Sequence, residues 1–179
     1  MFKTVRRIAL AAAAPAALLA YAATPAQAET GGPAGVAAAA ATPAVTAADP
    51  ITSQLLMDEV IARTNEERVL AGCAPLTVDE ELMIASVRQS HYMAATGDFG
   101  HIGWRGSTFE TRSRAAGYSD VAAENIAWGF ADAAEVMEAW MASPDHRENI
   151  LNCEARSFGA GVRRADDGTF YWTQVFGWR

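Results

Sequence analysis

Three histidines, His91, His101 and His146, are the residues of this chain best suited to proton transfer or metal binding. His101 follows Asp98-Phe99-Gly100, a glycine-flanked segment in which a side chain can face a cleft. His146 follows Ser143-Pro144, a typical helix start, where the helix dipole disfavours protonation of an imidazole. A neutral imidazole can ligate a metal ion or accept a proton. His91 lies within a helical pattern, and we interpret it as a surface or packing residue.

Glu124 is the acidic residue most in need of a partner. It is flanked by Ala122-Ala123 and Ile126-Ala127, and an unpaired carboxylate in such an apolar stretch is costly. We expect an imidazole to pair with it. His101, His146 and Glu124 together could hold zinc or another divalent ion, with Glu124 as the candidate catalytic base. Because they are spread along the chain without an H-E-x-x-H motif, a hydrogen-bonded cluster that holds the loop is the alternative interpretation.

Nucleophilic catalysis has little support in the sequence. It contains no G-x-S-x-G motif and no phosphate-binding glycine loop. The two cysteines, Cys73 and Cys153, form an even pair that favours a disulfide in an oxidising compartment. Two separate buried thiols are the alternative.

Helical patterns dominate the chain up to residue 151. An amphipathic pattern runs from Ile51 to about Gly72, and Thr77 with Glu80 fits a capping box that opens a second helix ending near Gly97. Further helices are predicted around Val121–Ala127, from the Asp132 and Glu135 cap onward, and from Ser143 to about Leu151. Residues 98–120 are predicted to form a long ordered loop.

The last part of the chain predicts a β-hairpin. Two apolar runs, Phe158–Arg164 and Thr169–Phe176, are separated by Ala165-Asp166-Asp167-Gly168. Both faces of the second run are largely apolar, which is typical of a sheet covered on both sides. The expected architecture is an α/β sandwich with one core over residues 51–179.

The N-terminal 50 residues have a different composition. Residues 1–28 have the features of a signal peptide, with basic Lys3, Arg6 and Arg7, an apolar run, and Ala26-Gln27-Ala28 before the cleavage point. A retained N-terminal anchor is the alternative. Residues 29–50, rich in Ala, Gly and Pro, predict a flexible linker. Removal of residues 1–28 leaves 11 basic and 21 acidic residues, a net charge of 11 − 21 = −10. This charge argues against affinity for nucleic acid. We further expect a monomer outside the cytoplasm, periplasmic or secreted, with no transmembrane segment in the mature chain.

An ordered set of short segments over residues 51–179 resembles the CAP superfamily (cysteine-rich secretory protein, antigen 5, pathogenesis-related 1; the SCP domain), in its bacterial YkwD-like branch. The matching segments are Asn65-Glu66-Glu67-Arg68, Pro75-Leu76, Met93-Ala94-Ala95, Phe99-Gly100-His101, Gly106-Ser107-Thr108, Ala116-Gly117-Tyr118, Glu124-Asn125-Ile126-Ala127, Trp140-Met141, Ser143-Pro144-Asp145-His146-Arg147, Asn149-Ile150-Leu151, Gly159-Ala160-Gly161-Val162 and Tyr171-Trp172-Thr173-Gln174-Val175-Phe176-Gly177.

The resemblance implies a three-layer α-β-α sandwich, with a small antiparallel sheet between helices and a central cleft lined by His and acidic residues. His101 and Glu124 match the first cleft His and the Glu of the ENI-type motif. Tyr171 stands where animal and plant members carry a second His, and the second cleft acid has no clear counterpart. The resemblance therefore implies a looser ligand cleft of His101, Glu124, His146 and Tyr171.

The sequence favours a non-enzymatic binding or interaction module over an enzyme. We expect its His/Glu cleft to bind a divalent metal such as zinc or a small apolar ligand. The metal is not required as a cofactor. The expected partner is a small molecule, a lipid or a cell-surface component. A metal-dependent, peptidase-like hydrolase using the same cleft is the alternative.

Overall fold

The structure, a computed structural model, describes residues 50–179. The expected signal peptide, 1–28, and the linker, 29–50 apart from its last residue, lie outside the described residues. Among the helices of the described part, none is long and apolar enough to cross a membrane.

The described chain contains both helices and strands, and its last two elements are strands. The helices are α1 (Pro50–Leu70), α2 (Glu80–Thr96), α3 (Phe109–Ala116), α4 (Ala133–Ala142) and α5 (Pro144–Ile150), with a 3-10 turn, η1, at Trp104–Gly106. The strands are β1 (Thr77–Val78), β2 (Val121–Trp128), β3 (Ser157–Arg164) and β4 (Phe170–Gly177).

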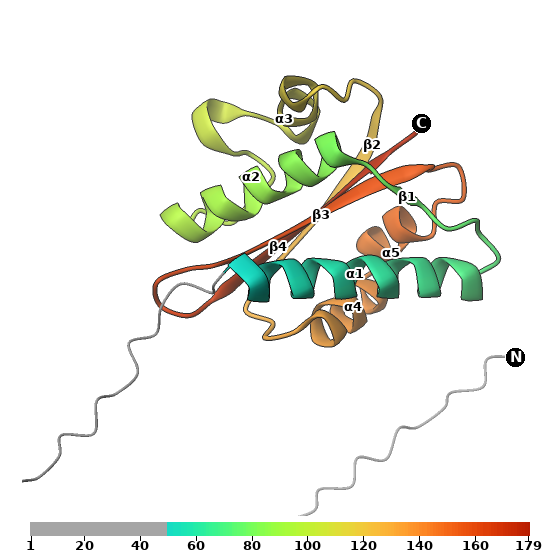
Figure 1. The fold of residues 1–179 in the computed structure, drawn as a ribbon, viewed down its shortest axis with the longest axis horizontal. Helices are drawn as coiled ribbons and strands as arrows, with labels where there is room; N and C mark the ends of the chain where they lie inside the picture. The colour runs from blue at the N-terminus through green and yellow to red at the C-terminus, as the bar shows by residue number, and fades with distance from the viewer. Residues whose placement is uncertain (1–49) are drawn as a thin grey trace, which may run out of the picture. The chain divides into compact units, whose positions relative to one another are not determined.

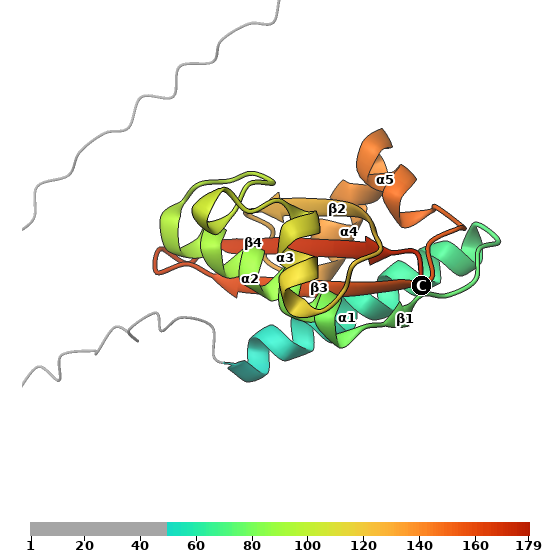
Figure 2. The same cartoon turned by 90° about the horizontal axis from the view of Figure 1, so that it is seen from above.

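The four strands form one sheet in the order β1-β3-β4-β2. The strand pairs β2–β4 and β3–β4 are antiparallel, whereas the two-residue β1 pairs with β3 in parallel, so the sheet is mixed. Helices α2 and α3 lie on one side of the sheet, and α1, α4 and α5 lie on the other (Figure 1; Figure 2). The expected three-layer sandwich and its covered C-terminal hairpin are confirmed.

Close approach of α2 to the sheet depends on two glycines of β3. A Cβ atom on Gly159 or Gly161 would collide with the backbone of α2 at Leu82 or Ser86. The Ser86 hydroxyl donates to the carbonyl of Gly159 at 2.9 Å, and the Ser90 hydroxyl donates to that of Gly161 at 3.0 Å. The two glycines of β3 and the two serine hydroxyls of α2 therefore hold α2 close against the sheet. The loop that follows α2 is positioned with it.

The opposite side of the sheet carries the larger apolar core. Trp140 of α4 and Trp172 of β4 are each 1% exposed, and Phe158 and Phe176 are fully buried beside them. The two phenylalanine rings lie 6.1 Å apart between centroids. Burial of this many aromatic groups is the main stabilising contribution on this side.

Three local predictions were wrong. Asp79, not Thr77, caps α2 by accepting a hydrogen bond from the amide of Leu82, and Thr77 belongs to β1. Residues 121–127 form strand β2 instead of a helix, and the expected loop 98–120 contains η1 and α3. Pairing along β4 outweighs the helical preference of the alanines in β2.

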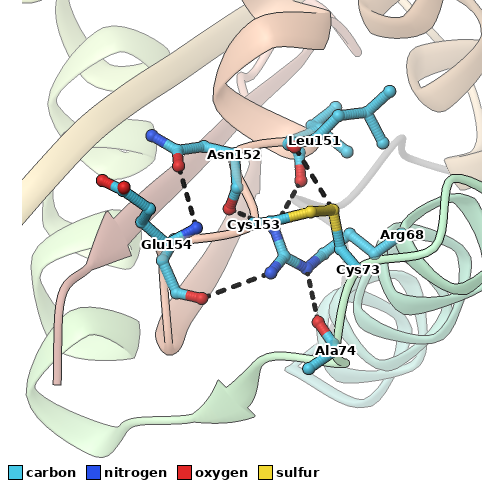
Figure 3. Close-up of a disulfide and its surroundings, with 9 residues drawn as sticks. Arg68, Cys73, Ala74, Leu151, Asn152, Cys153 and Glu154 are labelled. Atoms are coloured by element: carbon cyan, nitrogen blue, oxygen red, sulfur yellow. Dashed lines mark hydrogen bonds between the residues drawn. A yellow bond between two sulfur atoms is a disulfide. The ribbon is translucent and has the colours of Figure 1, made fainter.

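A disulfide and a buried arginine join the end of α1 to the segment after α5 (Figure 3). Cys73 and Cys153 are bonded, with Cα atoms 5.0 Å apart, which confirms the expected bridge. Arg68 is fully buried, and its guanidinium donates to four backbone carbonyls. These acceptors are Ala74 at 3.0 Å, Ile150 and Asn152 at 2.8 Å, and Ala155 at 3.2 Å.

Candidate functional site

His101 lies in the loop that follows α2. Gly97 ends the helix in a left-handed conformation, with φ 75°, which glycine adopts without steric cost. The buried amide of Gln89 donates to the carbonyl of Gly100 at 2.6 Å and holds the loop against the helix. The His101 side chain remains 54% exposed. A rigid backbone thus presents a largely exposed imidazole.

Glu124 lies beside this imidazole on β2, an outer strand of the sheet. Its side chain has no exposed surface, and its Oε1 is 2.9 Å from Nδ1 of His101. The other oxygen, Oε2, accepts a short hydrogen bond from Arg112. The expected His–Glu pairing is confirmed, and both oxygens of the carboxylate are engaged.

Arg112 of α3 is the site residue that the sequence did not reveal. Its Nη1 donates to the carbonyl of His101 at 3.1 Å and to that of Ser107 at 2.8 Å, while Nη2 reaches Glu124. The guanidinium therefore ties β2 to both ends of the His101 loop. The available signal was the buried Glu124 itself, because arginine is the usual cation for a buried carboxylate.

The hydrogen bond that His101 donates to Glu124 raises the pKa of His101, against the opposing effects of partial burial and the Arg112 charge. A carboxylate facing Nδ1 assigns the proton to that nitrogen in the neutral ring. Nε2 is then the nitrogen with a free lone pair. His101 can donate or accept at this atom, according to pH.

His146 of α5 lies near enough to respond to His101. Burial lowers the pKa of His146, and the charge of His101 lowers it further. We expected a neutral imidazole from the helix dipole; the direction agrees, but the main cause is burial. The His146 carbonyl accepts from the Asn125 amide at 3.1 Å, and Asn149 donates to Asn125 at 2.8 Å. These contacts attach α5 to β2.

Tyr171 lies apart from the His101–Glu124 pair. Its register partner on β2 is Trp128, four residues beyond Glu124, a separation of about 13 Å along a strand. Ile126 lies between them on the same face, buried with Met93 and Tyr171. The structure therefore brings together His101 and Glu124, with His146 nearby, and places Tyr171 at another position.

The sequence suggested that His101, His146 and Glu124 could bind a divalent ion. Within residues 50–179, no group of three or more His, Cys, Asp or Glu side chains is placed to hold a metal ion. Glu124 has both oxygens engaged by protein groups. Glu124 is therefore not free to act as a third metal ligand beside the two histidines.

Four exposed apolar side chains lie in the His101 loop and at the end of β2. Phe99, Ile102, Trp104 and Trp128 form what we call the apolar rim, with exposed fractions of 47%, 55%, 67% and 55%. Three belong to the His101 loop, and Trp128 ends the strand that carries Glu124. The rings of Phe99 and Trp128 lie 6.3 Å apart between centroids. Such grouping is uncommon on a surface that only faces water.

The fold and this site define a CAP domain. Residues 61–176 match the model of the cysteine-rich secretory protein family, CAP, and the chain belongs to that family.

Two curated proteins of Bacillus subtilis strain 168 are similar in sequence. YkwD is 34% identical over 132 residues, which are 73% of this chain and 50% of YkwD. The membrane protein YlbC is 30% identical over 120 residues, which are 66% of this chain and 33% of YlbC. The match thus spans half or less of the length of these relatives.

Solved structures share the fold at lower identity. An extracellular protein containing a SCP domain from Bacillus anthracis superposes with a TM-score of 0.65 at 24% identity, covering 71% of this chain and 41% of that chain. An outer surface protein of Borrelia burgdorferi gives 0.64 at 20% identity, covering 70% and 94%.

Proposed function

We propose that this chain acts outside the cytoplasm as a non-enzymatic binding module whose ligand contacts the exposed imidazole of His101 and the apolar rim. The observation that carries the proposal is the state of Glu124. Its side chain is fully buried, and its oxygens are held by His101 and Arg112. A general base must reach the proton that it removes. Glu124 is better placed to orient an imidazole than to meet a substrate.

The chemistry of the ligand follows from the surroundings of His101. Aromatic and aliphatic side chains gain free energy when a ligand covers them, and the imidazole adds one polar contact that fixes orientation. The strongly acidic chain argues against an anionic membrane as that ligand. A small, neutral, apolar molecule with one hydrogen-bonding group fits these features.

A divalent ion is an optional second ligand. His101 through Nε2 and His146 would hold it, and the ion would supply a positive charge beside the apolar rim. Orientation of a metal-binding imidazole by a buried carboxylate is a common arrangement. The low pKa of His146 supports this role, because only the neutral ring binds a metal.

A metal-dependent hydrolase has less support, because the candidate base is enclosed. The location outside the cytoplasm is supported by the expected signal peptide and by the extracellular and outer-surface descriptions of structural relatives.

The test uses N-phenyl-1-naphthylamine, a neutral apolar dye that fluoresces when bound. Trp104→Ala removes the most exposed rim residue next to His101, and Leu55→Ala removes a comparably exposed side chain from α1, 64% against 67%. We expect Trp104→Ala to weaken binding about fivefold or more, since it removes a large contact area, and Leu55→Ala to leave it unchanged.

Equal dye binding by all three proteins would contradict the proposal. A parallel zinc titration should lose its signal in both His101→Ala and His146→Ala. Turnover of a peptide or ester substrate that disappears in a folded Glu124→Gln variant would favour the hydrolase instead.

A further inference from the structure

A hollow lies at the C-terminal end of α2, where the helix meets the β3–β4 turn. Figure 1 shows the C-terminal end of α2 and this turn at the same end of the sheet. The hollow has a volume of about 670 Å³, within the range of small-molecule sites. His91 of α2, Arg163 of β3 and Tyr171 of β4 line it.

Arg163 is the residue that gives the hollow a chemical preference. It is half-buried, and its Nε is buried without a hydrogen-bond partner. Within residues 50–179, the Arg163 side chain makes no ion pair and no hydrogen bond. A guanidinium has five N–H donors, and buried donors are normally satisfied. Arg163 therefore has its whole donor capacity available to a ligand.

Two other polar groups share this hollow. Tyr171 is opposite Arg163 in the strand register, so their side chains project from the same face of the sheet. Tyr171 is 8% exposed, and no hydrogen bond of the described chain engages its hydroxyl. His91 contributes an exposed imidazole from the helix. A guanidinium, a phenol and an imidazole can all donate to one oxyanion.

The remaining charges around the hollow decide which oxyanion fits. Arg164 also lines it, but its Nε donates to the Gly168 carbonyl at 3.1 Å. Asp166 and Asp167 are exposed at the turn, and the carboxyl end of α2 adds partial negative charge nearby. Two arginines balanced by two aspartates disfavour a dianion. A planar monoanion that pairs with one guanidinium suits this balance better.

We propose that the hollow between α2 and the β3–β4 turn binds a small carboxylate-bearing molecule, with Arg163 as the anchor for the carboxylate and Tyr171 and His91 as additional donors. The site is separate from the His101 cluster and does not depend on the function proposed for it. It also gives Tyr171 a role different from that of a metal ligand.

The test compares two ligands of similar size. N-acetylalanine carries a carboxylate, and N-acetylalaninamide carries a neutral amide in its place. Backbone amide signals of the purified chain are followed by NMR during each titration. We expect saturable shifts at residues 91, 163 and 171 with N-acetylalanine, with a dissociation constant in about the millimolar range for so small a ligand. The amide and inorganic phosphate should bind about tenfold more weakly.

Matched variants assign the effect to the arginine. Arg163→Gln should weaken N-acetylalanine binding about tenfold, while Arg88→Gln, the same change at an exposed position of α2, should not. Arg163→Lys keeps the charge and should give an intermediate affinity; Tyr171→Phe should cost less than Arg163→Gln. Unchanged amide spectra outside the hollow would verify that each variant is folded.

Three results would overturn the proposal: equal binding of acid and amide, equal loss in both glutamine variants, or no saturable shift in the wild type. Phosphate binding as tight as that of the acid would overturn the choice of a carboxylate. His101→Ala should leave this titration unchanged, so failure here and failure of the His101 site are separate outcomes.

Discussion

Two buried arginines, Arg68 and Arg112, donate hydrogen bonds to different kinds of acceptor. Arg68 makes hydrogen bonds only to backbone carbonyls, which belong to the segments around the disulfide. Arg112 divides its donors between two carbonyls and the carboxylate of Glu124. Burial lowers the pKa of Arg68, and the charge of Arg156 lowers it further. The first arginine completes backbone hydrogen bonding, whereas the second holds a carboxylate in place.

This difference separates a structural region from a functional one. Around Arg68, within residues 50–179, every hydrogen-bond acceptor of the side chain is a main-chain carbonyl, and the contacts lead to no titratable group. Around Arg112 the chain of contacts continues through Glu124 to an imidazole that is 54% exposed. A buried ion pair is an expensive way to stabilise a fold. The Arg112–Glu124 ion pair contacts the exposed, titratable imidazole of His101, which supports a role in orienting that imidazole.

The largest effect is expected from Arg68→Met, which retains most of the side-chain volume. Four carbonyls would lose their donor, and those left buried would be unsatisfied, so the free energy of unfolding should fall by roughly 3 kcal/mol or more. Urea denaturation measures the change. Arg88→Met, at an exposed position, should stay within about 0.5 kcal/mol of wild type. A loss below about 1 kcal/mol in Arg68→Met would show that water or rearranged backbone replaces the guanidinium.

A smaller loss of stability but a clear change at His101 is expected from Glu124→Gln. The amide is isosteric and can still accept from Arg112, so the free energy of unfolding should fall by about 2 kcal/mol, less than when a buried ion pair loses one partner altogether. The pKa of His101 should move down, because its hydrogen bond to the Glu124 carboxylate is the main cause of its elevation.

Urea denaturation and an NMR titration of the imidazole check both parts of this prediction. Glu138→Gln, an exposed carboxylate on α4, is the matched control and should change neither quantity. An unaltered His101 titration in Glu124→Gln would remove the distinction between the two arginines, because Glu124 would then be structural only.

Much of the fold could be predicted because the relevant patterns are local. The hairpin has two apolar runs around a turn, and α2 has a buried stripe that includes Ser86 and Gln89. Strand β2 escaped prediction because its Ala-rich sequence has no strong β preference, and its conformation depends on pairing with β4. Helix α3 escaped because its buried residues, Arg112 and Ser113, are polar and give no apolar period.

The site was predictable only in part for the same reason. A carboxylate among apolar neighbours needs a partner, and this predicted an imidazole beside Glu124; the structure shows that the imidazole is that of His101. Nothing local distinguishes Arg112 from the other arginines, because its role arises when α3 folds over the loop. Likewise, the family position of Tyr171 suggested the cleft, but strand register places it with Arg163.

The smallest effect concerns the pH dependence of stability, and it tests whether the two site histidines act in opposite directions. The folded pKa of His101 is raised above the ordinary 6.5. Its contribution is therefore fully present below the unfolded pKa and is lost as pH rises through the folded value. The folded pKa of His146 is lowered from 6.5, so its contribution is present above that value and is lost as pH falls through the folded pKa.

In the wild type these two contributions give slopes of opposite sign on either side of pH 6.5, so stability should be greatest near that pH. His146→Asn should expose the His101 contribution as stability that falls when pH rises above 6.5. His101→Asn should expose the opposite slope below 6.5, because burial remains the main cause of the His146 shift. Each effect should stay below about 1 kcal/mol, since solvent screens the largely exposed His101. Urea denaturation between pH 5 and 8, the range in which histidines titrate, measures both slopes. Slopes of the same sign in the two variants would mean that Glu124 does not hold His101 as a charged partner, and the contrast between Arg68 and Arg112 would lose its functional meaning.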